Sequence, residues 1–122
     1  MLEANHILLY VADARRSCSF YGALLGLQPV EAQDTFCMFR LPSGVMLGLW
    51  GAAGVQPAAT PPGGFELGFA VAGGRAEVDA VHAQWQAQGI RVLQPPTAVD
   101  FGYTFTACDA DGHRLRVYAP GA

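Results

Sequence analysis

Residues 101–118 contain two segments of alternating character on either side of the dipeptide Asp111-Gly112. Because this dipeptide suits the positive φ angles of a tight two-residue turn, the pattern predicts a β-hairpin. Residues 38–50 have the same layout around Ser43-Gly44. Each hairpin closes a unit that opens with a strand and a helix, so the chain is predicted to contain two copies of one β-α-β-β-β module.

The two helices are indicated by their end signals and by apolar periodicity. Asp13 is a good N-cap for a helix that reaches about Leu25, and Gly26 suits its C-cap. Apolar side chains recur on one side of residues 75–88 and predict the second helix. His82 lies outside this apolar stripe and is expected to face solvent.

The chain is expected to form one domain made of the two modules. Its 122 residues are enough to bury roughly two-thirds of the unfolded surface. Strands at residues 5–11 and 65–71 open the modules. The first module covers about residues 1–51 and the second about 65–122, and a linker at about 52–64 is rich in Gly, Ala and Pro.

Composition narrows the partners and the compartment. A net charge of -3 and a pI near 5.4 leave no basic footprint for nucleic acid. The N-terminus lacks a signal-peptide pattern and no segment approaches ~18 uninterrupted apolar residues, so no membrane association is expected. Cys18, Cys37 and Cys108 are an odd count without CxxC spacing, which favours reduced thiols and a cytoplasmic location.

Motifs in both modules resemble those of a known superfamily. They are Ser17-x-x-Phe20-Tyr21 and Leu25-Gly26-Leu27 in the first module, and Asp109-Ala-Asp-Gly-His113 in the second. Together with the repeated module, they are similar to the vicinal-oxygen-chelate superfamily, which includes glyoxalase I, extradiol dioxygenases and bleomycin-resistance proteins. The resemblance implies an α+β fold in which two tandem βαβββ modules form a curled mixed sheet around a cavity. It also implies a homodimer.

Three further motifs are closest to the phenazine-resistance branch of this superfamily, which binds drugs without a metal. They are Leu49-Trp50-Gly51, Phe101-Gly102-x-Thr104-Phe105 and Asp111-Gly112-His113-x-x-Arg116-Val117. On this resemblance Trp50 corresponds to an aromatic residue on which the drug stacks. The alternative is a tryptophan that only fills the core.

The resemblance also identifies where a metal would be bound. Enzymes of the superfamily take metal ligands from the first and last strand of each module, and the corresponding residues here are His6, Gly48, Glu66 and Arg116. Gly48 offers no ligand and Arg116 is a permanent cation. A catalytic metal typically needs about three protein ligands, and only His6 and Glu66 remain. We therefore expect no metal, no cofactor and no catalytic residues.

Strand alternation predicts which side chains line the cavity. If both turns have two residues, Gly48 pairs with Phe39, Arg116 with Ala107, and Tyr118 with Phe105. Small residues at Gly48, Gly68, Ala70 and Ala107 would leave room for a flat ligand. A three- or four-residue turn would change this assignment. The aromatic wall is then predicted to contain Tyr10, Phe39, Trp50, Tyr103, Phe105 and Tyr118.

Arg116 and Glu66 are expected to lie side by side on this inner surface. Either they form a salt bridge in place of the metal, or Arg116 receives a ligand carboxylate while Glu66 holds the guanidinium. Arg114 lies on the same face nearer the hairpin tip and is expected to be a solvated surface charge. His6 is either a donor to a ligand oxygen or a structural residue.

These features predict a protein that binds and sequesters a planar, partly anionic aromatic compound, such as a phenazine-like antibiotic, and so confers resistance. No metal is required in this hypothesis. The alternative is a metal-dependent lyase, isomerase or dioxygenase that uses His6, Glu66 and a third, unidentified ligand.

Overall fold

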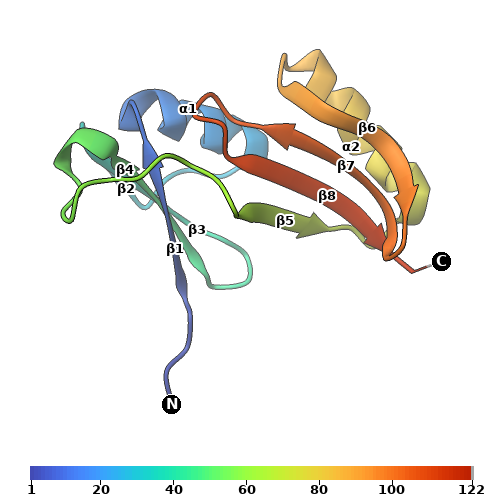
Figure 1. Cartoon of the computed structure of the whole chain (residues 1–122), viewed down its shortest axis with the longest axis horizontal. Helices are drawn as coiled ribbons and strands as arrows, with labels where there is room; N and C mark the ends of the chain where they lie inside the picture. Colours follow the sequence, from blue (N-terminus) through green and yellow to red (C-terminus); the bar gives the residue numbers. More distant parts are fainter. Residues whose placement is uncertain (122) are drawn as a thin grey trace. The chain divides into compact units, whose positions relative to one another are not determined.

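The computed structural model describes residues 1–121 and divides the chain into two compact units. The first unit covers Met1–Pro61, and the second begins at Pro62. Figure 1 shows the elements of both units in chain order. Each unit contains one α-helix and one four-stranded sheet, and the two units repeat the same element order.

The first unit folds its chain into a mixed sheet with the strand order β1-β4-β3-β2. Strand β1 runs parallel to β4, whereas β3 is antiparallel to both β4 and β2. A short 3-10 helix, η1, follows the last strand at Ala52–Gly54. The elements are β1 (His6–Val11), α1 (Ala14–Leu25), β2 (Glu31–Ala32), β3 (Phe36–Arg40) and β4 (Met46–Gly51).

The second unit has the equivalent strand order, β5-β8-β7-β6, again with a parallel pair at one edge. Its elements are β5 (Glu66–Ala70), α2 (Gly74–Ala87), β6 (Arg91–Val99), β7 (Gly102–Cys108) and β8 (Arg114–Pro120). The predicted α+β fold of two βαβββ modules is therefore confirmed. The strands form two separate open sheets, whereas the prediction had one curled sheet.

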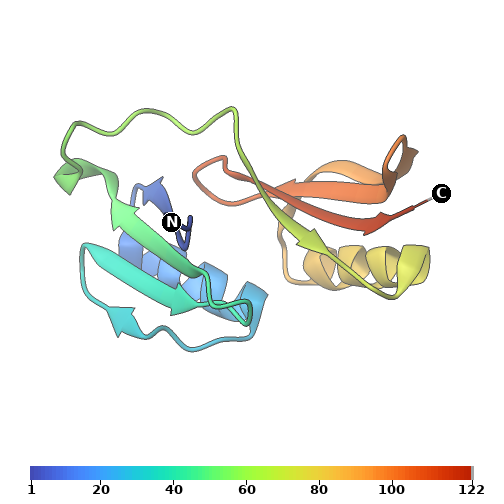
Figure 2. The same cartoon turned by 90° about the horizontal axis from the view of Figure 1, so that it is seen from below.

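Each helix covers one face of the sheet in its own unit, as Figure 2 shows for α2 along β7 and β8. Along β1 and β5 the alternate side chains Leu9, Val11 and Leu67 are buried on that face. The faces opposite α1 and α2 therefore carry the other half of each strand's side chains. The predicted parity of β1 and β5 is confirmed.

The helix ends follow the predicted signals. Asp13 caps α1 by accepting hydrogen bonds from the backbone N–H groups of Arg15 and Arg16, at 3.1 and 3.2 Å. Gly26 ends the helix in the left-handed conformation, with φ 67°. The prediction for His82 was wrong, because its ring packs edge-on against buried Phe105, 5.2 Å between ring centroids. His82 lies on the α2 face that packs against the sheet. The packed face of the helix therefore includes residues outside the apolar stripe that was read from the sequence.

Both hairpin loops have three residues, not the predicted two. In the first, the N–H of Leu41 donates to the carbonyl of Val45, and in the second Asp109 donates to His113. Gly44 and Gly112 each close their loop with φ 95°, the positive angle typical of a three-residue hairpin loop with a glycine bulge. The extra loop residue shifts the register by one. The side chains of β3 and β7, the strands that precede the two loops, consequently lie on the opposite face of the sheet from the predicted one.

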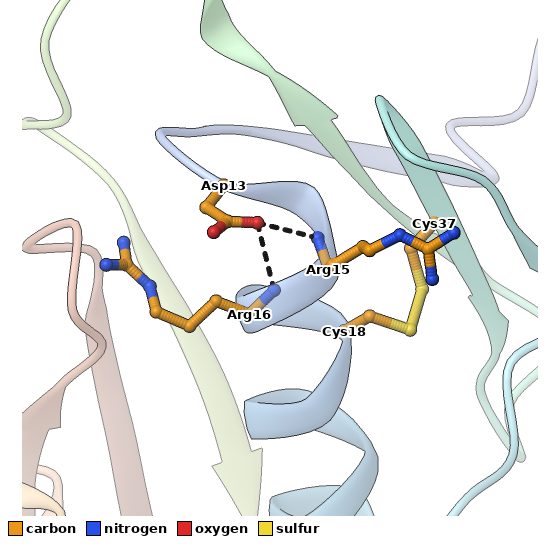
Figure 3. The surroundings of a disulfide bond; sticks show 5 residues. All are labelled: Asp13, Arg15, Arg16, Cys18 and Cys37. Atoms are coloured by element: carbon orange, nitrogen blue, oxygen red, sulfur yellow. Dashed lines mark hydrogen bonds between the residues drawn. A yellow bond between two sulfur atoms is a disulfide. The ribbon is translucent and has the colours of Figure 1, made fainter.

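A disulfide joins Cys18 of α1 to Cys37 of β3, with 6.0 Å between the Cα atoms (Figure 3). The expectation of three reduced thiols was therefore wrong for this pair, while Cys108 is free and buried. The reason is tertiary: α1 packs against β3, which brings together two residues 19 positions apart that no local motif connects. Within the described residues, no helix is both long enough and apolar enough to cross a membrane.

Candidate ligand-binding site

The face opposite α2 in the second unit gathers most of the polar site residues. Strand pairing places its side chains in three rows across the sheet. The rows are Glu66, Arg114, Cys108 and Arg91; then Gly68, Arg116, Thr106 and Gln94; then Ala70, Tyr118, Thr104 and Thr97. Three arginines and a single carboxylate among these twelve residues give this face a positive charge in an otherwise acidic protein.

Arg116 and Glu66 form a two-pronged ion pair on this face. Arg116 donates from Nε to Glu66 Oε1 at 2.7 Å and from Nη2 to Oε2 at 2.9 Å. Its third nitrogen, Nη1, donates to Thr104 Oγ1 at 3.3 Å. The hydrogen bond to Arg116 lowers the pKa of Glu66 below its ordinary value of 4.5, and the same contact raises the pKa of Arg116. The guanidinium is thereby fixed in direction and stays charged.

Aromatic rings and a gap lie next to this ion pair. Phe101 meets Tyr118 edge-on, with 5.9 Å between centroids, and the Arg116 guanidinium carbon lies 6.0 Å from the centre of the Phe101 ring. A Cβ atom added to Gly68 would meet only the Tyr118 ring, at 3.7 Å. The strip along Gly68 and Ala70 therefore offers backbone surface against which a flat molecule can lie.

Phe101 and Thr104 were not among the predicted site residues. Both belong to the motif Phe101-Gly102-x-Thr104-Phe105, so the signal was present in the sequence. It was missed because the two-residue turn placed Thr104 on the wrong face.

Two predicted wall residues of β7 face α2 instead. Phe105 is fully buried against the ring of Trp85, at 5.3 Å between centroids. Tyr103 donates its hydroxyl proton to Asp79 of α2 at 2.8 Å, and this hydrogen bond raises the pKa of Tyr103. Their assignment to the aromatic wall was wrong, since the register pairs Thr106, not Ala107, with Arg116.

The face opposite α1 in the first unit carries the other predicted aromatics. Tyr10 and Trp50 are register partners and meet edge-on at 6.4 Å between centroids, with Phe36 next to Trp50 on β3. Phe39 was wrongly assigned to this wall: it is fully buried on the opposite face, where it contacts Gly22 of α1. Phe36 takes its place, because the one-residue shift exchanges the two faces of β3.

The expected gap at Gly48 is filled. A Cβ atom added there would lie 2.6 Å from Leu8 Cδ2 and 3.1 Å from Phe36 Cζ, so neighbouring side chains already cover the glycine. Space for a flat ligand is thus found beside Gly68 and not beside Gly48.

The residues at the four metal-ligand positions do not fit a bound metal. Gly48 has no side chain, and the Glu66 carboxylate is engaged by the guanidinium of Arg116. His6 is exposed and its Nδ1 lies 2.7 Å from the Asn5 side-chain oxygen. No step of chemistry through a metal follows from this set.

Three potential metal ligands, Asp109, Asp111 and His113, do cluster in the second hairpin loop. One oxygen of the Asp109 carboxylate accepts hydrogen bonds from the backbone N–H groups of Asp111 and His113, at 3.0 and 2.9 Å. The second oxygen lies 2.9 Å from His113 Nδ1. These bonds shape the three-residue loop. The ring of His113 thus contacts the Asp109 side chain within the loop.

Comparison with known proteins establishes the family. The sequence profile of the Glyoxalase/Bleomycin resistance protein/Dioxygenase superfamily matches residues 3–117. The chain belongs to this superfamily. The phenazine antibiotic resistance protein EhpR of Enterobacter agglomerans is 31% identical over 119 residues, which is 95% of this chain and 91% of EhpR.

Two solved structures share the fold of this superfamily member. Protein ATC0852 from Agrobacterium tumefaciens is 47% identical with a TM-score of 0.91, and the match covers 100% of both chains. A glyoxalase-related enzyme from Fulvimarina pelagi is 25% identical with a TM-score of 0.85, covering 98% of this chain and 88% of the other. The predicted glyoxalase/bleomycin-resistance fold is thus confirmed.

Proposed function

We propose that this protein binds a planar aromatic carboxylate without the help of a metal, and so withdraws a phenazine-type antibiotic from solution. The observation that carries the proposal is the face opposite α2, where Arg116 is held by Glu66 next to Tyr118, Phe101 and the bare backbone of Gly68. A flat ring gains stacking and burial against such a surface, and an anionic substituent is attracted by the excess of arginines over carboxylates on this face. The name of EhpR supports this ligand class.

Metal independence is proposed from the chemistry of the donor set. A metal in this fold would need Glu66, whose two oxygens are occupied by Arg116. Removing Glu66 from that pair would leave a permanent cation where the metal should bind, and like charges repel. Binding in this proposal therefore uses rings, backbone and polar side chains in place of a metal.

The test is a titration of chelator-treated protein with phenazine-1-carboxylate, followed by tryptophan fluorescence and by calorimetry. Saturable binding with whole-number stoichiometry, and recovery of unchanged ligand, is the expected result. Cyclohexane carboxylate, which has the charge but not the flat ring, is the matched control and should not bind. Binding that appears only after a divalent metal is added, or conversion of the ligand, would overturn the proposal in favour of a metal-dependent enzyme.

A resistance role predicts protection in cells. Expression in a phenazine-sensitive bacterium should raise the phenazine concentration that stops growth, in proportion to the amount of protein, because sequestration is stoichiometric. A variant with impaired binding should give less protection at equal expression. The homodimer and the cytoplasmic location remain predictions, which light scattering and cell fractionation can check.

A further inference from the structure

Two arginines lie two residues apart on the same face of β8, but their surroundings differ. Arg116 uses three nitrogens in hydrogen bonds, two to Glu66 and one to Thr104. The contact from Arg114 to Glu66 is a single one at 4.0 Å, which is too long for a hydrogen bond, and its side chain is 60% exposed. Arg114 therefore has all five N–H donors to offer, whereas Arg116 has two of its five left.

Charge balance on this face separates the two residues further. Glu66 is the only carboxylate in the three rows, and its charge is matched by Arg116 through two short hydrogen bonds. Among the residues that the structure describes, the positive charge of Arg114 has no comparable partner. An anion that approached Arg116 would meet the Glu66 carboxylate on the same guanidinium, and like charges at such distances repel.

Arg114 also lies between two hollows of the second unit. One, of about 690 Å³, is lined by Gly63, Gly64, Phe65, Glu66, Gly112 and Arg114. The other, of about 270 Å³, is lined by Leu93, Gln94, Thr106, Arg114 and Arg116. A ligand in either hollow lies against Arg114, but Arg116 reaches only the smaller one.

The smaller hollow adds neutral hydrogen-bonding groups to the guanidinium. The hydroxyl of Thr106 donates to the Gln94 side-chain oxygen at 3.4 Å. This leaves the two N–H donors of the Gln94 amide for another acceptor. A carboxylate between Arg114 and Gln94 would thus be met by donors on two sides, while its ring could extend over the Gly68 strip.

On these observations we infer that Arg114 is the residue that selects an anionic ligand, and that Glu66 reserves Arg116 for a positioning role. The inference rests on the proposed function and names the residue that makes a planar aromatic carboxylate preferred over a neutral planar compound. It assigns a specific task to a residue that sequence reasoning treated as a solvated surface charge.

The experiment compares phenazine-1-carboxylate with unsubstituted phenazine, in the wild-type protein, in two single variants and in one double variant. Arg114→Gln should weaken binding of the carboxylate by about tenfold and change binding of phenazine by less than about twofold. Arg91→Gln removes the same charge from the same face, but Arg91 lines neither hollow, so its ligand preference should match the wild type. The double variant Arg116→Gln/Glu66→Gln removes the ion pair without changing the net charge of the face, and should weaken both ligands to a similar extent because it disturbs the surface they share.

Salt provides an independent readout. The wild-type preference for the carboxylate should shrink between about 0.05 and 0.5 M salt, and the Arg114→Gln protein should show little salt dependence. An unchanged preference in Arg114→Gln, or its loss in Arg116→Gln/Glu66→Gln, would overturn the inference. Equal wild-type affinity for both ligands would overturn it and leave the proposed function standing, whereas binding of neither ligand would overturn both.

Discussion

Arg116 and Glu66 meet fork to fork across neighbouring strands β8 and β5, through two hydrogen bonds of 2.7 and 2.9 Å. The two residues are 50 positions apart, so only the parallel pairing of these strands brings them together. If either group left the pair, the other would remain as a partly buried charge without a partner, which is unfavourable. The ion pair therefore acts as a fixed part of the sheet face around which a ligand has to bind.

The first prediction concerns the pH dependence of stability. Because Arg116 lowers the pKa of Glu66 in the folded protein, the stabilisation is complete above the unfolded value near 4.5 and is lost as pH falls through the folded pKa. Glu66→Gln should remove on the order of 1 kcal/mol at neutral pH and flatten the loss of stability below about pH 5. Urea unfolding from about pH 3 to pH 7 measures this.

Glu3→Gln is the control for that experiment, since Glu3 is exposed near the N-terminus. It should follow the wild-type curve. An equally steep acid dependence in Glu66→Gln would show that the Arg116 pair contributes nothing to stability.

The second prediction separates the two glycines of the equivalent strands. Gly68→Ala should change the free energy of unfolding by less than about 0.5 kcal/mol, because the added Cβ meets only the edge of the Tyr118 ring, at 3.7 Å. The same methyl group should weaken ligand binding, because it fills the strip along the glycine. Gly48→Ala should destabilise the protein by about 1 kcal/mol, because its Cβ would lie 2.6 Å from Leu8 Cδ2 and 3.1 Å from Phe36 Cζ, and both side chains would have to move aside. Thermal unfolding and phenazine-1-carboxylate titration of both variants test this. Wild-type affinity in Gly68→Ala would place the ligand elsewhere.

The third prediction concerns Trp50, whose ring is partly exposed beside Tyr10. If the ligand stacks on this ring, Trp50→Ala should reduce its binding free energy by about 1–3 kcal/mol, and Trp50→Phe by less. Calorimetry is the measurement, because Trp85 is the only tryptophan left to report by fluorescence. Unchanged affinity in Trp50→Ala, with unfolding still cooperative, would assign the tryptophan to packing alone.

The sequence predicted the fold better than it predicted the walls of the site. The correct assignments follow from burial: alternate side chains of β1 and β5 had to face the helices, which left Glu66 and Gly68 on the other side. Residues after each turn, such as Arg116, were also placed correctly relative to these strands.

The aromatic residues assigned to the wrong face all lie on the strands before the turns. Phe39 and Phe105 were placed on the faces that Phe36 and Thr106 occupy, because a dipeptide ending in glycine is compatible with both a two- and a three-residue loop. One additional loop residue moves all side chains of the preceding strand to the other face of the sheet, and local composition does not determine the loop length. The Cys18–Cys37 contact was out of reach for a related reason, since it depends on how a helix packs and not on spacing.

The last prediction is that the disulfide stabilises the first unit and leaves one thiol free. Without reductant, the denatured protein should titrate a single thiol, that of Cys108, and three after reduction. Since the bridge closes a loop of 19 residues, its loss in Cys18→Ser should cost roughly 3 kcal/mol of unfolding free energy through the entropy of the unfolded chain. Cys108→Ser is the matched control, because it keeps the disulfide. Reductant should lower the stability of Cys108→Ser as much as that of the wild type, and should leave the stability of Cys18→Ser unchanged. The prediction would be contradicted if protein kept from reductant had three reactive thiols and if reductant did not change its stability. In that case α1 and β3 would be joined by packing alone.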